Sequence, residues 1–449
     1  MRLRVKKTQK DKSRCLMEKH NKELLSLLKE GISPSIGCTE PIAVAHAVAK
    51  AREKSAGKDL ISLQVQVDPN LYKNGLMVTI PGTKDKGLSA AAALGFLFGK
   101  SEKGFRVIDE LTEKEAEKAR SLLAQKKITV TLNKDYQGLH IEVILITDSD
   151  KLRVIVDQTH LNVISVERVN KDEDFLPSSS PDMNKDKAGL NHKIREYGLE
   201  DFLQFSNNIP LAELAFLDEG VRINLRIAQE GLTKEQDVAA ALTRLVKEGL
   251  ISDDMITYAQ ILCAAASEAR MAGSRLPVMS TANSGNHGIT AFLTNYAVAE
   301  KQKLPQEKLL RSLALTNLIT FFIKSYTGTL SAMCGCGVAA GIGAGAGVVY
   351  LFGGTKDQMM GVLYNMVGSI SGMICDGAKE GCAYKLAMAS GWAVQSALLS
   401  LKDSVIHNTD GIVDPGFKQL FKNLGYLCDP GMVNADKAIL DVMLRKKEN

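Results

Sequence analysis

Four of the eight cysteines in this chain lie in one segment, between residues 331 and 385. They are Cys334, Cys336, Cys375 and Cys382. Thiolates are the natural ligands of zinc and of iron–sulfur clusters. Zinc sites normally show two close C-x-x-C pairs, whereas this segment has C-x-C and, about forty residues later, a second and wider pair, with no histidine nearby. The spacing favours a cluster held by three cysteines from different segments; the alternative is four buried cysteines that pack as small apolar side chains.

A further cysteine, Cys38, stands in the segment S-P-S-I-G-C-T-E-P, directly before a predicted helix. Ser35 or Thr39 can cap this helix, and the following proline suits its first turn. A helix N-terminus lowers the pKa of a thiol and also binds carboxylates, so Cys38 is a candidate reactive thiolate at an anion site. The alternative is that Cys38 only packs in the loop and that Glu40 is merely a favourable acid in the first helical turn.

A third polar segment, M-S-T-A-N-S-G-N-H-G, also precedes a predicted helix. Its backbone N–H groups, together with Asn283, Ser284 and Asn286, could hold a carboxylate or an amino group. His287 is a candidate acid or base, although a lone histidine more often makes a local hydrogen bond. Such loops are common, so this motif alone is weak evidence for a binding site. It supports one only in combination with the segment around Cys38.

With these motifs, the chain resembles the iron–sulfur L-serine dehydratases. It resembles their relatives more closely, namely the L-cysteine desulfidases and the serine-dehydratase-like alpha-chain proteins. The resemblance extends over nearly the whole chain, with its segments in the same order: residues 31–51, 70–83, 279–291, 330–347 and 372–387. The serine dehydratases have a Ser/His-rich loop where this chain has G-C-T-E-P, and that departure favours the desulfidase branch.

The resemblance implies a [4Fe–4S] cluster bound by Cys375, Cys382 and a third cysteine, either Cys334 or Cys336, of which Cys334 is favoured. It also implies that Cys38 is the catalytic base. Together, the motifs and the resemblance give these substrate-binding candidates: Ser35, Thr39, Glu40, Asn74, Asn283, Ser284, Asn286 and His287.

The implied activity is the β-elimination of L-cysteine to pyruvate, ammonia and hydrogen sulfide, without pyridoxal phosphate. A site that binds a substrate thiol needs little change to bind a hydroxyl. A dehydratase of L-serine or another β-substituted amino acid is therefore the first alternative. A non-catalytic iron–sulfur or redox-sensing protein that kept the fold is the second. A purely structural role, with no cluster at all, is the third.

The pattern of apolar residues predicts an α+β protein, in which an all-helical catalytic core carries an inserted α/β domain with an antiparallel sheet. Residues 60–170 contain alternating β-branched stretches, including one at 75–80, and form the inserted domain. The charged, Ser/Pro-rich segment 171–198 is the predicted linker. The core then consists of residues 17–59 and 199–449.

The charge of the chain is concentrated at its start. Residues 1–16 carry seven basic side chains and one acid, so they account for the net charge of +5, and the rest of the chain is almost neutral. We expect a disordered extension at 1–16 and no nucleic-acid partner. No apolar signal peptide is present, so we expect cytoplasmic thiols and not a disulfide framework.

An uncharged run at 325–355 is long enough to span a bilayer. It is rich in Gly and Ala, which favour membrane insertion less than Leu or Phe, so we expect a buried helix and no membrane partner. Gly337, Gly341 and Gly345 have the spacing of closely packed helices. A large apolar helical core also makes a homodimer plausible.

Overall fold

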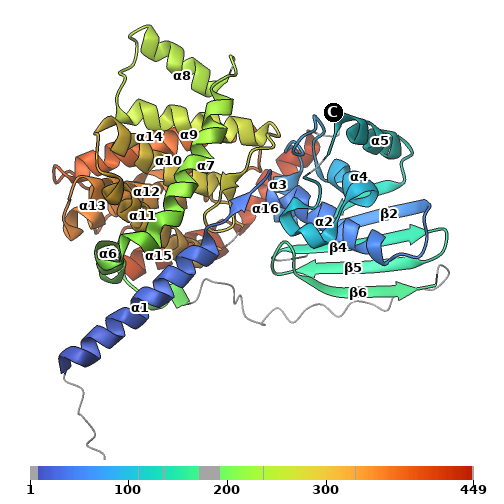
Figure 1. Cartoon of the computed structure of the whole chain (residues 1–449), viewed down its shortest axis with the longest axis horizontal. Coiled ribbons are helices and arrows are strands. Elements are labelled where there is room, and N and C mark those ends of the chain that lie inside the picture. Colours follow the sequence, from blue (N-terminus) through green and yellow to red (C-terminus); the bar gives the residue numbers. More distant parts are fainter. Residues whose placement is uncertain are drawn as a thin grey trace, which may run out of the picture.

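The structure is a computed structural model, which describes residues 9–446 except 110, 135, 137, 171–192, 236 and 329, with side chains from residue 18 onward. The buried apolar side chains form two large cores. One lies among helices and defines the helical lobe; the other lies between a sheet and helices and defines the sheet lobe. Figure 1 shows the two lobes side by side. The predicted α+β class is confirmed.

The sheet lobe is built on a five-stranded sheet with the order β3-β2-β4-β5-β6. The pair β2–β3 is parallel and the other pairs are antiparallel, so the sheet is mixed and not purely antiparallel as predicted. Helices between β2 and β3 form the crossover that a parallel pair requires. Helices α2 and α4 cover one face of the sheet. The bounds are β2 Leu60–Val67, β3 Ile128–Leu132, β4 His140–Thr147, β5 Lys151–Asp157, β6 Val163–Val169, α2 Thr39–Lys54, α4 Leu88–Phe98, the 3₁₀ helix Ser101–Arg106 and α5 Glu113–Ala124.

The sheet lobe contains a short helix directly before the segment 75–80, where a strand was predicted. Helix α3, Pro69–Gly75, begins with the cap residue Asp68, whose carboxylate accepts hydrogen bonds from the N–H groups of Asn70 (2.9 Å) and Leu71 (3.0 Å). A capping aspartate followed by proline is a strong helix start. The predicted strand at 75–80 is therefore wrong, because its first residue ends this helix and the next residues form a loop.

The helical lobe surrounds helix α12, which contacts α10, α11, α13 and α14. The run 325–355 is divided, because α11 ends at Thr327 and α12 begins at Ala339, with the first cysteine pair between them. No helix in the described part of the chain is both long and apolar enough to cross a membrane. The bounds are α1 Gln9–Gly31, α6 Leu199–Asn208, α7 Ala215–Gly231, α8 Val238–Lys247, α9 Met255–Met271, α10 Gly285–Lys301, α11 Gln306–Thr327, α12 Ala339–Leu351, α13 Lys356–Ile370, α14 Cys382–Ser400, α15 Phe417–Tyr426, and the short turns Lys193–Glu196, Leu211–Leu214 and Leu427–Gly431.

The chain passes between the lobes at places that differ from the predicted boundaries. Helix α2 lies within the segment 17–59 assigned to the catalytic core, yet it packs in the core of the sheet lobe. The last helix, α16, Val433–Arg445, also joins the sheet lobe, through buried Leu440. Figure 1 shows α16 where the two lobes meet. Apolar side chains decide this placement, because each helix follows the core that covers its apolar face.

Two predicted irregular segments are partly ordered. Helix α1 begins at Gln9, so residues 9–16 are helical where disorder was predicted, because lysine, arginine and glutamine continue a helix at little cost. Residues 1–8 lie outside the described part, as does most of the predicted linker, 171–192. The end of that linker already belongs to the helical core, in which Ile194 and Tyr197 are buried.

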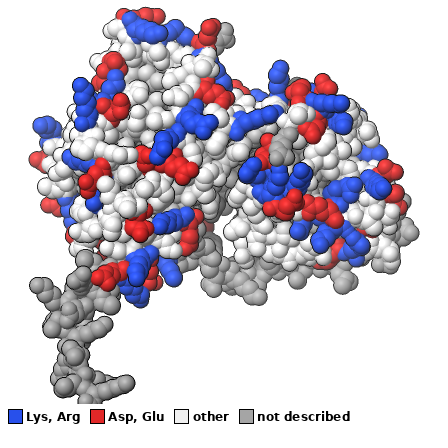
Figure 2. Space-filling view, viewed as in Figure 1, with Lys and Arg blue, Asp and Glu red and all other residues white. Residues whose placement is uncertain are grey.

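Charged side chains of both signs are interspersed on the surface. Figure 2 shows Lys and Arg next to Asp and Glu over both lobes on the face in view. Neighbouring opposite charges partly cancel, so this face presents no extended potential of one sign.

Glycines allow α12 to lie directly on α11. A Cβ atom on Gly343 would overlap the Thr320 hydroxyl and lie 2.6 Å from the carbonyl oxygen of Thr316. At Gly341 the nearest atom would be the flexible Met366 Cε, at 3.3 Å. The spacing of Gly337, Gly341 and Gly345 thus indicated a helix with a glycine-lined face. The close backbone approach to α11, however, is at Gly343, which lies on another face of α12.

We predict that Gly343→Ala lowers the free energy of unfolding by about 1–3 kcal/mol, because the new methyl group would force α11 and α12 apart. Gly341→Ala on the same helix is the control, and it should change stability by less than about 1 kcal/mol because the methyl has room and alanine favours a helix. Urea denaturation of both variants measures the difference. Equal midpoints for the two variants would contradict this account of the contact.

Candidate active site between the lobes

The two polar loops predicted from the sequence lie side by side. Strand β1, Pro34–Ser35, pairs antiparallel with β7, Val278–Met279. The pairing continues on both loops, because the N–H of Ser280 donates to the carbonyl of Ser33 at 2.8 Å. The loop before Cys38 and the loop before His287 therefore form one connected surface.

Cys38 is buried at the N-cap of α2, and its thiol donates a hydrogen bond to Glu40 Oε2 at 2.8 Å. Thr39 Oγ1 donates to the same oxygen at 3.1 Å. Burial raises the pKa of Cys38 well above its ordinary value, and the charge of Glu40 raises it further. The expected lowering of this pKa by the helix N-terminus is therefore wrong, because desolvation and the adjacent carboxylate outweigh the helix dipole. Cys38 is a protonated thiol at neutral pH.

Arg270, at the end of α9, joins the two polar loops. Its guanidinium is buried and donates to the Gly37 carbonyl at 2.6 Å and to Asn286 Oδ1 at 2.9 Å. Its positive charge opposes the rise in the pKa of Cys38, whose main causes are burial and Glu40. Sequence analysis missed this residue; the available signal was a single arginine at the end of an Ala-rich apolar helix.

His287 is buried next to the first cysteine pair. A Cβ atom on Gly335, the residue between Cys334 and Cys336, would overlap His287 Nε2 and lie 3.2 Å from Lys324 Nζ. Burial lowers the pKa of His287 well below its ordinary value, and the charge of Lys324 lowers it further. The imidazole is therefore neutral at pH 7, and neither ring nitrogen has a hydrogen-bond partner among the described residues.

The two cysteine pairs meet through their backbones. The N–H of Cys334 donates to the Met373 carbonyl at 2.8 Å, and the N–H of Cys375 donates to the Ala332 carbonyl at 2.6 Å. Cys382 begins α14 and packs beside Cys38 in a small apolar cluster. The structure thus brings together cysteines from separate segments of the chain.

The four thiols also act on one another electrostatically. A hydrogen bond from Cys336 lowers the pKa of Cys334 to about 6, and the same contact raises the pKa of Cys336. Burial raises the pKa of Cys375 to about 11 and also raises the pKa of Cys382, and the charge of Cys334 adds to both shifts. A single thiolate, Cys334, therefore lies within electrostatic reach of the three other thiols.

The four cysteines suit an iron–sulfur cluster better than a single metal ion. No group of three or more His, Cys, Asp or Glu side chains within the described ranges is placed so that it could hold one metal ion. An iron–sulfur cluster needs a wider arrangement of ligands. Its thiolates bind different iron atoms and therefore lie further apart than the ligands of a single ion. The soft sulfur donors of the four cysteines, which are buried or half-buried, are of the chemical kind that binds such a cluster.

A sequence model of the serine dehydratase alpha chain matches residues 102–441. The chain belongs to the serine dehydratase alpha-chain family. It is also similar to proteins named UPF0597 protein. The relative from Caldanaerobacter subterraneus subsp. tengcongensis is 41% identical over 424 residues, which cover 94% of this chain and 98% of the relative. The relative from Clostridium tetani is 41% identical over 421 residues (94% and 98%), and that from Clostridioides difficile is 39% identical over 426 residues (93% and 98%).

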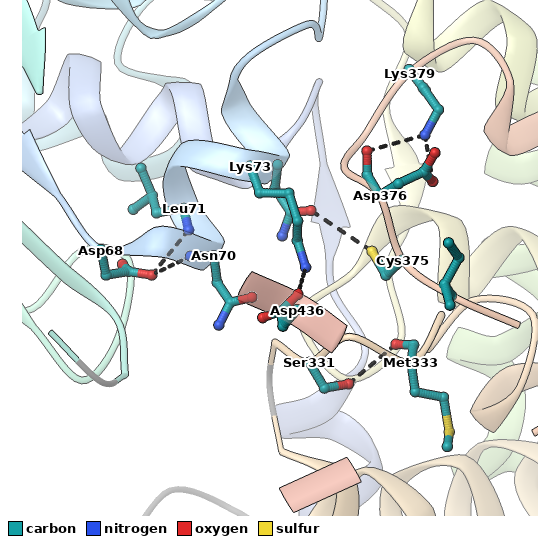
Figure 3. Close-up of polar contacts among 12 residues, drawn as sticks. Asp68, Asn70, Leu71, Lys73, Ser331, Met333, Cys375, Asp376, Lys379 and Asp436 are labelled. Carbon is teal, nitrogen blue, oxygen red and sulfur yellow. Dashed lines mark hydrogen bonds and ion pairs between the residues drawn. The ribbon is translucent and has the colours of Figure 1, made fainter. Parts of the chain in front are cut away.

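The remaining predicted substrate residues lie in three different surroundings. Ser284 Oγ lies 3.9 Å from Cys336 Sγ, and Asn74 Oδ1 lies 3.8 Å from Cys375 Sγ, so both contact the cysteine segments. Figure 3 shows this approach of α3 to Cys375. Ser35 Oγ is buried and has no hydrogen-bond partner in the described part of the chain. Asn283 is exposed at the tip of its loop, away from these contacts.

Two further residues at the cysteine segments were missed. Lys324 on α11 is buried, and burial lowers its pKa, while the thiols of Cys428, Cys336 and Cys375 act against that shift. Cys428, which had no predicted role, lies 3.6 Å from Met333 Sδ. Lys324 stands ten residues before Cys334 at the end of α11, whereas Cys428 comes from the segment after α15, which only the fold brings here.

We predict that Arg270→Met lowers the free energy of unfolding by about 2–3 kcal/mol, because the Gly37 carbonyl and Asn286 Oδ1 would lose their buried donor. Arg222→Met is the control: this arginine is 72% exposed and pairs with Asp218 on the same helix, where water can replace it, so the loss should stay below about 1 kcal/mol. Denaturant unfolding compares the two. An equal loss of unfolding free energy in the two variants would contradict the stabilising role given to the buried hydrogen bonds of Arg270.

We also predict that Glu40→Gln lowers the pKa of Cys38, because the adjacent negative charge that raises it is removed. The pH at which Cys38 reaches half of its maximal alkylation rate should move to lower values, and site-resolved mass spectrometry of the iodoacetamide-treated, metal-free chain measures it. Cys263, buried in the helical core with a pKa that burial raises to about 12, should not change. An unchanged profile for Cys38 would contradict the role given to Glu40.

Proposed function

We propose that this protein is a lyase that catalyses the β-elimination of L-cysteine to pyruvate, ammonia and hydrogen sulfide with a [4Fe–4S] cluster. One observation carries the proposal: Cys38 packs in a small apolar cluster with Val78 and Met271, and Cys382 lies against it. The proposed base and a proposed cluster ligand therefore lie in one packed cluster, although they are far apart in the sequence.

In the proposed enzyme, Cys375, Cys382 and Cys334 would hold the cluster. A cluster with three thiolate ligands has one iron without a protein ligand and supplies a Lewis acid when bound. The choice of Cys334 over Cys336 is supported by its low pKa of about 6, since a ligand must be a thiolate. Buried Lys324 lies close to these thiols and would balance their negative charge.

Cys38 is the proposed base that takes the α-proton of the substrate. Its own proton can pass to Glu40 Oε2, which lies 2.8 Å away. The buried thiolate, once formed, is a strong base because its pKa is high. As the Cα–H electrons form the new double bond, the Cβ–S bond breaks and releases hydrosulfide. The resulting enamine, 2-aminoacrylate, tautomerises and reacts with water to give pyruvate and ammonia.

The polar groups around Cys38 suit an amino acid substrate. Arg270 and Lys324 are two buried cations that favour a carboxylate. Ser35 Oγ and His287 Nε2 are buried and lack hydrogen-bond partners among the described residues. Buried polar atoms are rarely left without partners, so these two atoms are candidates to bind polar groups of the substrate.

Anaerobic purification tests the cluster. The protein should be brown, with iron and acid-labile sulfide, and Cys375→Ala should remove the colour. Cys263→Ala, which alters a cysteine far from the proposed ligands in sequence, should keep it. A colourless anaerobic protein without iron would refute the cluster and, with it, the proposed mechanism.

We predict that Cys38→Ser keeps the cluster absorbance but lowers turnover of L-cysteine by at least about 100-fold, because a positioned base contributes a factor of this size. Pyruvate formation in the anaerobic, cluster-loaded protein is the measurement. Turnover equal to that of the wild type would exclude Cys38 as the base.

L-Serine is the second candidate substrate, and the family itself favours it, since the matching model describes the serine dehydratase alpha chain. Pyruvate release from a panel of β-substituted amino acids decides between the two. A cluster with no turnover of any of them would indicate a redox-sensing protein instead. A cytoplasmic location and a homodimer stay predictions.

A further inference from the structure

A buried ion pair joins helix α3 to the last helix of the chain. The ammonium group of Lys73 pairs with the carboxylate of Asp436 on α16, 363 residues later, as Figure 3 shows. The side chain of Lys73 is 1% exposed and that of Asp436 is 19% exposed. A buried ammonium needs a partner of opposite charge, so the position of Lys73 depends on α16.

The same turn of α3 lies against the second cysteine segment. Asn74, the residue after Lys73, has its Oδ1 3.8 Å from Cys375 Sγ. Gly377 has a φ of +91°, and a Cβ atom there would overlap the Lys73 carbonyl oxygen and lie 3.5 Å from Met443 Cε of α16. The end of α3 is therefore held between the cysteine loop on one side and α16 on the other.

Helix α16 is itself fixed to the sheet lobe. Its Leu440 is buried in the core of that lobe. On its outer side, Asp441 forms a surface ion pair with Lys134 at 3.6 Å, with both side chains more than half exposed. One helix thus presents a partly buried carboxylate to α3 and an exposed one to solvent, and the second serves as a control for the first.

We propose that the Lys73–Asp436 pair is a positioning element for Cys375. The pair holds the last turn of α3 in place. That turn keeps Asn74 next to the Cys375 thiol and packs against Gly377. The loop that carries Cys375 is therefore held against α3 and shielded from solvent. The inference rests on the proposed function only where it calls Cys375 a cluster ligand. The contacts that it uses are independent of any cluster.

The two partners should respond unequally to substitution. Asp436→Asn leaves the ammonium of Lys73 buried without a counter-charge, whereas Lys73→Met leaves a carboxylate that is partly exposed and that water can reach. Asp436→Glu keeps the charge. The expected order of disturbance at Cys375 is therefore Asp436→Asn first, Lys73→Met second, and Asp436→Glu near the wild type.

The test is the alkylation rate of each cysteine by iodoacetamide in the full, metal-free chain, resolved by mass spectrometry. Asp436→Asn should speed alkylation of Cys375 about tenfold or more, because the loop opens locally. Asp441→Asn should keep the wild-type rate. Cys263, buried in the helical core, reports global unfolding and should stay unreactive in every variant.

In the cluster-loaded protein, Asp436→Asn should also lose its visible absorbance to a chelator faster than Asp441→Asn does. If no preparation contains iron, the proposed function fails while the alkylation comparison still decides the inference. If Cys263 becomes reactive in Asp436→Asn, the milder Lys73→Met decides: faster alkylation of Cys375 with silent Cys263 supports the inference. Alkylation of Cys375 at the wild-type rate in Lys73→Met and Asp436→Asn would overturn it.

Discussion

The candidate site depends on the buried guanidinium of Arg270. An unpartnered charge inside a protein costs several kcal/mol, so the guanidinium requires acceptors on more than one side. The Gly37 carbonyl and Asn286 Oδ1 provide them, and they come from two loops that are far apart in the sequence. The short pairing of β1 with β7 aligns these loops, and the guanidinium fixes how closely they approach. The position of Cys38 relative to His287 follows from that contact.

Charge then separates the thiols into two chemical kinds. Cys38 faces the carboxylate of Glu40 in a buried place, so it holds its proton strongly. Cys334 receives a hydrogen bond from Cys336 and gives up its proton more readily. A thiol that keeps its proton suits a base that acts transiently, whereas a thiolate suits a ligand. The same residue type is therefore a protonated thiol in one place and a thiolate in the other, because burial and neighbouring groups shift the two pKa values in opposite directions.

The division of the chain between two lobes explains why these groups meet. The segments around Cys38 and Asn74 lead into or belong to the sheet lobe, whereas His287 and the first cysteine pair belong to the helical lobe. Helix α16 returns from the helical lobe to the core of the sheet lobe at the end of the chain. Gly335 and Gly377 allow the cysteine segments to lie directly against His287 and α3, since a side chain at either position would overlap them.

The sequence by itself determined the local features of this protein. Alternating and helical periodicity predicted the α+β class, and the Gly/Ser/Asn loops before α2 and α10 identified the polar side of the site. The number and spacing of the cysteines predicted that the segments around Cys334 and Cys375 come together, because residue type and separation can be read directly from the sequence. The helical start at Asp68 was also readable in the sequence, whereas the alternation that predicted a strand at 75–80 was misleading, because a few alternating residues do not suffice to identify a strand.

Only the tertiary structure decided the environment of each group. The burial of Cys38 under Val78 and Met271, the bridge made by Arg270, and the approach of Cys428 to the first cysteine pair all depend on contacts between distant segments. The assignment of α2 and α16 to the sheet lobe does so as well. Pattern along the chain shows which face of a helix is apolar, but not which core will cover it. For the same reason the helix terminus predicted a thiolate at Cys38, whereas the packed structure makes it a protonated thiol, because desolvation is a property of the packed structure.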